Sequence, residues 1–304
     1  MTAVSRALLL CVPLILFAGA GALYTPFGSQ LEDEADVALS SLPKLPSWAA
    51  TPLPDFSTIR DTTERKAAFF SFLYPRIVLA NSRILIERQY LESLRSNTKL
   101  SDTELKWLAE HAARLRIDEA NGSKAQFALL EKRIGVIPPS LILAQAANES
   151  AWGTSRFATQ GNNLFGQWCF SKGCGLVPLS RVPGASHEVA KFASPYGSIR
   201  AYITNLNRHP TYQRVRDVRQ KARRNGNPLS GVAMASGLLG YSERGEDYVK
   251  EIRAMIRYNN LEFYDKQFQA LIADRSPEHL LKLATASNAE ALLPGSSDVN
   301  APEH

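Results

Sequence analysis

Apolar side chains recur at helical spacing over most of the chain. The first long run begins at Asp61-Thr-Thr-Glu64, which has the spacing of a capping box, and its apolar residues repeat every three or four positions as far as Leu94. Pro75 lies inside this run, and we expect it to kink or split the helix because proline has no amide hydrogen. Further helices are predicted from the capping signal Ser101-Asp-Thr-Glu104 and over residues 124–133.

Residues 141–153 form the most apolar of the predicted helices. Prolines precede it, Ser140 is expected to cap it, and Gly153 is expected to end it. Its one ionisable side chain is Glu149, and neither Gln145 one turn before nor the turn after offers a cation. A carboxylate in such apolar surroundings should have a raised pKa, as a general acid for sugar cleavage requires. The alternative is a glutamate that reaches water or pairs with an arginine from elsewhere.

Helical spacing gives way to short β-type segments between Trp168 and Phe192. These segments are separated by glycines and prolines, which predicts a small β-hairpin lobe. Helices resume after Ser194-Pro195, where Pro210 ends the first of them. Further helices are expected near residues 232–239, 245–258 and 266–283. The pattern as a whole predicts a mainly α (α+β) protein.

The start of the chain has the organisation of an export signal. Arg6 precedes an apolar run and then a group of small residues, so residues 1–24 are expected to be a signal peptide or a membrane anchor. Pro13 and the shortness of the run favour cleavage. The remaining boundaries are a proline-rich linker or arm over residues 25–60, one domain over 61–265, and a C-terminal helix and tail over 266–304. The last residues, 287–304, are expected to be disordered.

Composition and charge narrow the class of partner. The chain has 304 residues, 45% of them hydrophobic and 21% charged, and a formal net charge of +6. A mildly basic protein suits an anionic partner such as a cell-wall polymer or a phospholipid surface. Nucleic acid is not expected, since an exported protein meets little of it and the sequence has no recognition motif. The arginines at 208, 214, 216, 219, 223 and 224 are interpreted as a solvated helical face.

Two cysteines, Cys169 and Cys174, remain once the export signal is removed. A close pair in an oxidising compartment predicts a small disulfide loop. A zinc site would need two more ligands, and no histidine or cysteine stands at suitable spacing nearby. No metal or other cofactor is therefore expected.

Two motifs carry a resemblance to a known family. The stretch from Ala144 to Phe157 (AQAANESAWGTSRF), followed by Gly161-Asn-Asn-Leu-Phe-Gly166, resembles the signature of bacterial peptidoglycan β-N-acetylglucosaminidases, glycoside hydrolase family seventy-three. The resemblance extends over roughly residues 61–261 and is strongest to the family's exported Bax-like subgroup. Segments supporting the subgroup are Trp168–Cys174, Ser198–Asn207, His209–Tyr212 and Leu239–Tyr248.

The resemblance implies a lysozyme-like fold, in which a helical lobe and a small β-lobe enclose a sugar groove. It gives Glu149 the role of catalytic acid and makes Tyr241 a further catalytic candidate. Glu188 is the one acid between Glu149 and Asp217, so it is the candidate for the family's second carboxylate. It would act as a nucleophile or as a base, or it would be a bystander if the acetamido group of the substrate attacks instead. Expected substrate-binding residues are Asn163, Phe165, Trp168, Tyr202 and Tyr248.

The implied activity is hydrolysis of the β-1,4 bond after N-acetylglucosamine in peptidoglycan glycan strands. The protein would then be periplasmic or otherwise exported, touching a membrane only through an uncleaved N-terminal segment. Two alternatives stay open. One is a lytic transglycosylase, which also uses a single glutamate on a lysozyme-like fold, and the other is a cell-wall-binding protein without activity.

Overall fold

The computed structural model describes residues 42–179, 181 and 184–296. The export signal expected over residues 1–24 lies outside the described residues. Within them the chain is mainly helical with one small antiparallel sheet, which confirms the predicted lysozyme-like fold class. The α-helices are α3 (Thr62–Arg95), α4 (Asp102–Arg114), α5 (Lys124–Arg133), α6 (Pro139–Ser150), α7 (Arg156–Gly161), α8 (Pro195–Arg208), α9 (Gln213–Arg224), α10 (Gly231–Met234), α11 (Glu246–Tyr258), α12 (Glu262–Leu271) and α13 (Pro277–Ala284).

Helix α3 passes through Pro75 without a break, so of the expected kink or split the split does not occur. Proline removes the hydrogen bond to the carbonyl four residues earlier, which belongs to Ser71. Ser71 is exposed, so water can bond that carbonyl. The next carbonyl, that of Phe72, accepts a hydrogen bond from Nη1 of Arg76 at 2.7 Å. The helix therefore loses one internal bond without leaving a buried polar group unsatisfied.

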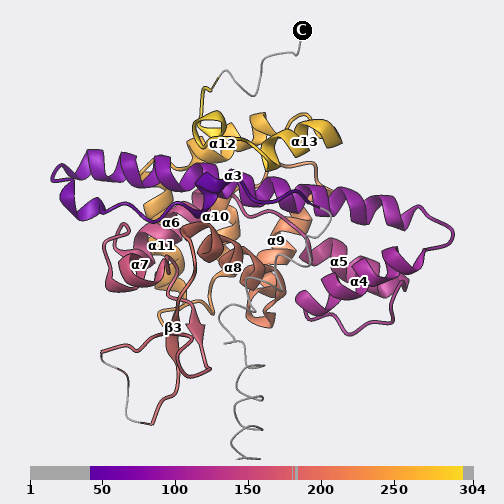
Figure 1. Ribbon diagram of the computed structural model, residues 1–304, viewed down its shortest axis with the longest axis horizontal. Coiled ribbons are helices and arrows are strands. Elements are labelled where there is room, and N and C mark those ends of the chain that lie inside the picture. Colours follow the sequence, from indigo (N-terminus) through magenta and orange to yellow (C-terminus); the bar gives the residue numbers. More distant parts are fainter. Residues whose placement is uncertain (1–41, 180, 182–183, 297–304) are drawn as a thin grey trace, which may run out of the picture.

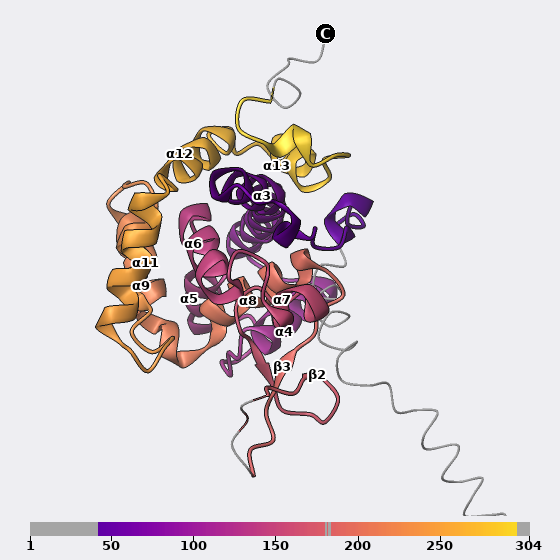
Figure 2. The same cartoon turned by 90° about the vertical axis from the view of Figure 1, so that its left-hand side faces the viewer.

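Helix α3 is the axis on which the other helices pack. Figure 1 shows it running the length of the molecule, with α12 and α13 on one side and α6 and α8 on the other, and Figure 2 shows the same arrangement end-on. By length and composition α3 could cross a membrane, but 78% of its most apolar 18-residue window is buried inside the protein. It is a core helix.

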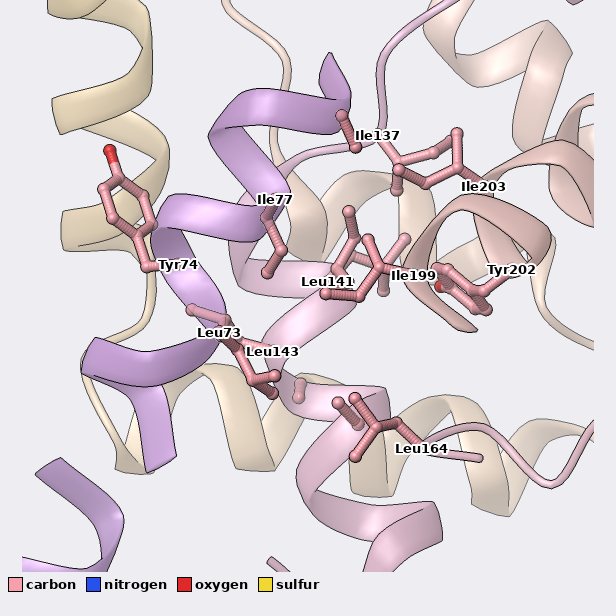
Figure 3. Packing of buried hydrophobic residues seen from close by; sticks show 14 of the residues in the cluster. Leu73, Tyr74, Ile77, Ile137, Leu141, Leu143, Leu164, Ile199, Tyr202 and Ile203 are labelled. Carbon is pink, nitrogen blue, oxygen red and sulfur yellow. The ribbon is translucent and has the colours of Figure 1, made fainter. Parts of the chain in front are cut away.

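The main core lies where α3, α6 and α8 meet. Figure 3 shows side chains from all three helices converging there, and each is almost fully removed from solvent. Burying a side chain of this size contributes about 1.5–3 kcal/mol. A second apolar cluster joins the far end of α3 to α4 and α5. The labelled members of the main core from these helices are Leu73, Tyr74, Ile77, Leu141, Leu143, Ile199, Tyr202 and Ile203.

The small β-lobe that was predicted is a three-stranded antiparallel sheet. Its strands are β1 (Trp168–Cys169), β2 (Gly175–Leu176) and β3 (Glu188–Ala190), and β3 lies in the middle. The register pairs Trp168 with Val189 and Leu176 with Val189 on either side. A disulfide joins Cys169 and Cys174 as predicted, with their Cα atoms 6.2 Å apart.

Both ends of the described chain pack on α3. In the proline-rich arm, two short 3₁₀ helices (Ser47–Ala50 and Phe56–Thr58) bury Ala49 and Phe56. At the other end the structure differs from prediction. Residues 266–283 belong to two helices, and the tail as far as residue 296 is not disordered, since Leu292 is 1% exposed. These segments carry enough apolar surface to be held by packing, despite their polar composition.

The arginines of α9 form the predicted solvated face only in part, since Arg214 and Arg224 are exposed. Arg216 and Arg219 are 3% and 1% exposed. Nη1 of Arg216 donates to the carbonyls of Leu206 and His209, at the end of α8. Arg219 donates to the carbonyl of Lys132 in the last turn of α5 and to those of Gly135 and Val136 in the segment after it. Helix C-termini carry partial negative charge, so these buried cations are satisfied by backbone.

Candidate active site

Helix α6 starts inside the core, where the carboxylate of Asp265 on α12 caps it. The backbone N–H of Ser140 donates to Oδ1 of Asp265 at 2.8 Å, and the Ser140 hydroxyl donates to Oδ2 at 2.6 Å. Oδ2 also accepts from the N–H of Gly231 at 3.1 Å, so one buried carboxylate holds the first turns of α6 and α10. The prediction that Ser140 is itself the cap was wrong, because α6 begins at Pro139.

The buried cap makes stability depend on pH. Burial raises the pKa of Asp265 to about 6, although its hydrogen bonds from Ser140 and Gly231 oppose the rise. Between pH of about 4 and 6 the folded protein then binds more protons than the unfolded chain, so the Asp265 contribution to stability is lost as pH rises through 6. Urea unfolding from pH 4 to 7 is expected to show wild type losing stability relative to Asp265→Asn. Parallel curves would contradict this.

The turn after α6 fixes the end that carries the candidate acid. Residues 151–153 are all left-handed, with φ of 50°, 59° and 78°. This conformation costs a non-glycine residue about 1–2 kcal/mol, so packing must hold it. The Trp152 ring packs edge-on against Phe69 and Phe70 of α3, with centroids 5.8 and 5.3 Å away. Gly153 is needed for its φ and because a Cβ there would lie 2.7 Å from an aromatic ring of the arm.

Glu149 is half-buried, and its two carboxylate oxygens have different surroundings. Oε1 accepts a hydrogen bond from the Tyr248 hydroxyl at 2.6 Å and a longer one from the Asn148 amide at 3.4 Å. Oε2 lies beside exposed Gly166, where an added Cβ would be 3.9 Å from it. Within the described part of the chain, no lysine, arginine or histidine forms an ion pair with Glu149. One oxygen is held and the other is free to meet a ligand.

A buried chain of hydrogen bonds leads to Oε1 of Glu149 from α8. The Tyr202 hydroxyl donates to the Gln145 carbonyl, the Gln145 amide donates to the Tyr248 hydroxyl at 2.8 Å, and that hydroxyl donates to Glu149. Gln145 is 0% exposed, and the two tyrosines are 1% and 2% exposed. Burial raises the pKa of both tyrosines above the usual value, and the charge on Glu149 raises them further. The tyrosines therefore stay protonated at neutral pH, and all three bonds point toward the carboxylate.

Each tyrosine of this chain of hydrogen bonds belongs to a stacked aromatic pair. The rings of Phe165 and Tyr202 are 4.1 Å apart, and those of Tyr241 and Tyr248 are 5.4 Å apart and nearly parallel. The Tyr241 hydroxyl donates to the carbonyl of Phe165 at 2.8 Å, which ties one pair to the other. Burial raises the pKa of Tyr241, and it raises the pKa of neighbouring Tyr212 to about 12. Tyr241 thus packs against Tyr248, the residue that donates a hydrogen bond to Glu149.

Asn163 organises the loop between α7 and β1. It is 1% exposed, and its amide donates to the carbonyls of Gln167 and Ala190 at 2.9 Å each. Its carbonyl oxygen accepts from the N–H groups of Phe165 and Gln167. Both donors and both acceptor positions of the side chain are occupied by backbone, which leaves none for a sugar hydroxyl. Phe165 is likewise buried, at 2% exposed.

Glu188 holds the disulfide loop. It lies on β3, is 5% exposed, and accepts hydrogen bonds from the N–H groups of Gly173 at 3.0 Å and Gly175 at 2.8 Å. These two bonds lower its pKa, with smaller contributions from Arg181 and Lys172. Its carboxylate is therefore charged and engaged with backbone. The sulfurs of Cys169 and Cys174 also lie within 4.8 Å of it, but as a disulfide they cannot bind metal as thiolates.

Trp168 is the predicted binding residue that reaches solvent. It is 60% exposed, and one face stacks on the His187 ring with centroids 4.1 Å apart. Phe170, two residues on, is 70% exposed. The structure thus separates the predicted binding residues into two groups. Trp168 lies on the surface of the β-lobe, whereas Asn163, Phe165, Tyr202 and Tyr248 are buried around Glu149.

Sequence reasoning gave no role to Gln145 or Asp265. Gln145 did leave a signal, because it is a polar residue one turn before Glu149 on the same face of an otherwise apolar helix. Asp265 left none, since its partners lie 125 and 34 residues away in sequence.

Known proteins resemble the chain over this region. Residues 124–261, which include α6, the β-lobe and α11, match the family model Glucosaminidase, described as mannosyl-glycoprotein endo-beta-N-acetylglucosaminidase. Over 214 residues the chain is 34% identical to Protein bax of Escherichia coli (strain K12), covering 70% of this chain and 76% of that protein. No solved structure matches the chain. The chain therefore belongs to the glucosaminidase family, as a Bax-like member.

Proposed function

We propose that this protein is a peptidoglycan hydrolase that cleaves the β-1,4 bond after N-acetylglucosamine, with Glu149 as general acid. The observation that carries the proposal is the asymmetry of the Glu149 carboxylate. Tyr248 holds Oε1, no described cation pairs with the group, and Oε2 lies beside exposed Gly166. The acid proton then belongs on Oε2, from which it passes to the glycosidic oxygen as the bond to the sugar breaks.

The second step of the reaction does not need Glu188. Both of its oxygens accept backbone hydrogen bonds in the disulfide loop, and these bonds lower its pKa. A carboxylate so engaged is a weak base and a poor nucleophile. The acetamido oxygen of the substrate therefore attacks its own anomeric carbon. Glu149, now ionised, takes a proton from the water that opens the resulting ring.

The β-lobe and the buried aromatic residues have separate tasks in this proposal. The exposed ring of Trp168 offers an apolar face on which a sugar can stack. The wall behind Glu149 consists of Tyr241, Phe165 and Tyr202, which position the Glu149 side chain and do not touch the substrate themselves. The net charge of +6 suits a polymer whose stem peptides carry carboxylates.

Product analysis on purified sacculi tests the proposal. Mass spectrometry is expected to find reducing N-acetylglucosamine ends. Anhydromuramic ends would show a lytic transglycosylase instead. Binding to sacculi without soluble product would show a wall-binding protein. Either of these two results would refute the proposal.

Access to peptidoglycan requires export, for which residues 1–24 provide the proposed signal. A cleaved signal would release the protein to the periplasm, and an uncleaved one would anchor it to the inner membrane. The mass of the protein recovered from a periplasmic extract separates the two outcomes.

Replacing Tyr248 by Phe is expected to lower kcat about 10- to 100-fold with little change in KM. The variant loses the hydrogen bond that holds Oε1, a bond to a charged group worth about 1.5–3 kcal/mol. Steady-state kinetics on soluble glycan strands measures the effect. Tyr258→Phe is the matched control, since that ring lies on the same helix and is 84% exposed. Equal kcat values for the two variants would contradict a positioning role for Tyr248.

A further inference from the structure

A cavity of about 320 Å³ lies at the end of α6 remote from Glu149. Pro138 and Pro139 line it, so it is separated from Glu149 by about ten residues of helix, or about 15 Å. Helices α3, α9 and α12 and the segment between α9 and α10 provide the rest of its wall. Its size is in the range of small-molecule sites.

Three arginines from three different segments line this cavity: Arg88 on α3, Arg223 on α9 and Arg275 after α12. Arg88 donates to the carbonyl of Glu131 at 2.7 Å and pairs with Glu92 at 3.0 Å. Nε of Arg275 donates to the backbone carbonyl of Ile272 at 2.9 Å.

Arg223 differs from the other two. Its guanidinium donates no hydrogen bond to any described residue and forms no ion pair there, although the residue is half-buried. Burial, with repulsion from Arg88 and Arg275 against the attraction of Glu92, lowers the pKa of Arg223 to about 10. The guanidinium N–H groups of Arg223 have no acceptor among the described residues, so they are available to a bound anion.

Negative charge in the wall does not cancel these cations. The lining carboxylate is that of Asp265, and both of its oxygens accept hydrogen bonds from the first turns of α6 and α10. Glu92 neutralises Arg88, so Arg223 and Arg275 against Asp265 leave an excess of one positive charge. The apolar part of the wall includes Leu85, Phe268 and Ile272.

We propose that this cavity is a second ligand site, which binds a phosphate monoester that carries an apolar group. The phosphate head pairs with Arg223 and Arg275, and Arg223 engages two of its oxygens in a bidentate contact. The apolar group packs against Phe268 and its neighbours. The site is independent of Glu149 and of the proposed hydrolase activity.

Calorimetric titration of the whole protein with phenyl phosphate at low ionic strength tests the site. One saturable site is expected, with inorganic phosphate binding more weakly and phenol not at all. Benzoate, which carries one negative charge, is also expected to bind more weakly. Affinity is expected to fall at least about tenfold in Arg223→Gln, because a charge-assisted bidentate contact is lost. Arg224→Gln is the matched control, being the next residue on α9 and exposed.

Two results would overturn the proposal. One is the absence of saturable binding of phenyl phosphate to wild type. The other is an equal loss of affinity in Arg223→Gln and Arg224→Gln, which would indicate unspecific attraction to a basic surface. Arg275→Gln is expected to weaken binding as well. The melting temperature of each variant shows whether a loss of affinity comes from a folding defect. Glu149→Gln should bind phenyl phosphate like wild type.

Discussion

Glu149→Gln is expected to remain folded and to lose turnover of purified sacculi by about a thousand-fold. Glutamine keeps the size of the side chain and can still accept the hydrogen bond from Tyr248 through its carbonyl oxygen. It places an amide where Oε2 stands, and an amide cannot give a proton to a leaving oxygen. Release of soluble fragments from dye-labelled sacculi measures the loss, and circular dichroism checks the fold.

Glu188→Gln is the informative companion to this variant. Its expected effect is mainly on the stability of the disulfide loop, because its two backbone donors lose a charged partner. Turnover by the folded fraction should stay within about tenfold of wild type. Unchanged turnover in Glu149→Gln would refute the assignment of the acid. A loss in Glu188→Gln as large as that in Glu149→Gln would refute the substrate-assisted second step.

Asp265→Ala is expected to destabilise the protein by about 3 kcal/mol. The substitution leaves three buried donors without their acceptor, namely the N–H and hydroxyl of Ser140 and the N–H of Gly231. Each unsatisfied donor costs about 1–3 kcal/mol, and water from the adjoining cavity offsets part of the sum. Urea unfolding measures the change.

Glu262→Ala is the control for the cap, since Glu262 is an exposed residue on the same helix. Its free energy of unfolding should lie within about 0.5 kcal/mol of wild type. Equal stability of Asp265→Ala and Glu262→Ala would mean that the caps of α6 and α10 are dispensable.

Much of the fold could be predicted from sequence, because the helices that pack on one face repeat their apolar residues every three or four positions. The errors arose where tertiary contacts decide. Pro75 lies inside an unbroken helix because the carbonyl that it leaves without a hydrogen bond belongs to Ser71, an exposed residue, where water can bond it. Arg216 and Arg219 are buried because helix C-termini supply carbonyls from segments distant in sequence. Local charge and spacing carry no information about such partners.

Glu149 could be identified from the sequence of one helix, whereas the residues that contact it could not. Glu149 is conspicuous as the lone ionisable group in an apolar run. The residues that hold it come from α8 and α11, and Gln145 bonds to residues 57 and 103 positions away. Tyr202 and Tyr248 were therefore assigned to substrate, although the structure places both behind the acid.

The contact between the two ends of the described chain has a consequence for biosynthesis. Nε1 of Trp48 donates to the carbonyl of Ala286 at 2.7 Å, and Arg83 on α3 donates to the carbonyls of Pro43 and Ala284. During synthesis, the hydrogen bonds to the carbonyls of Ala284 and Ala286 cannot all form until residue 286 has left the ribosome.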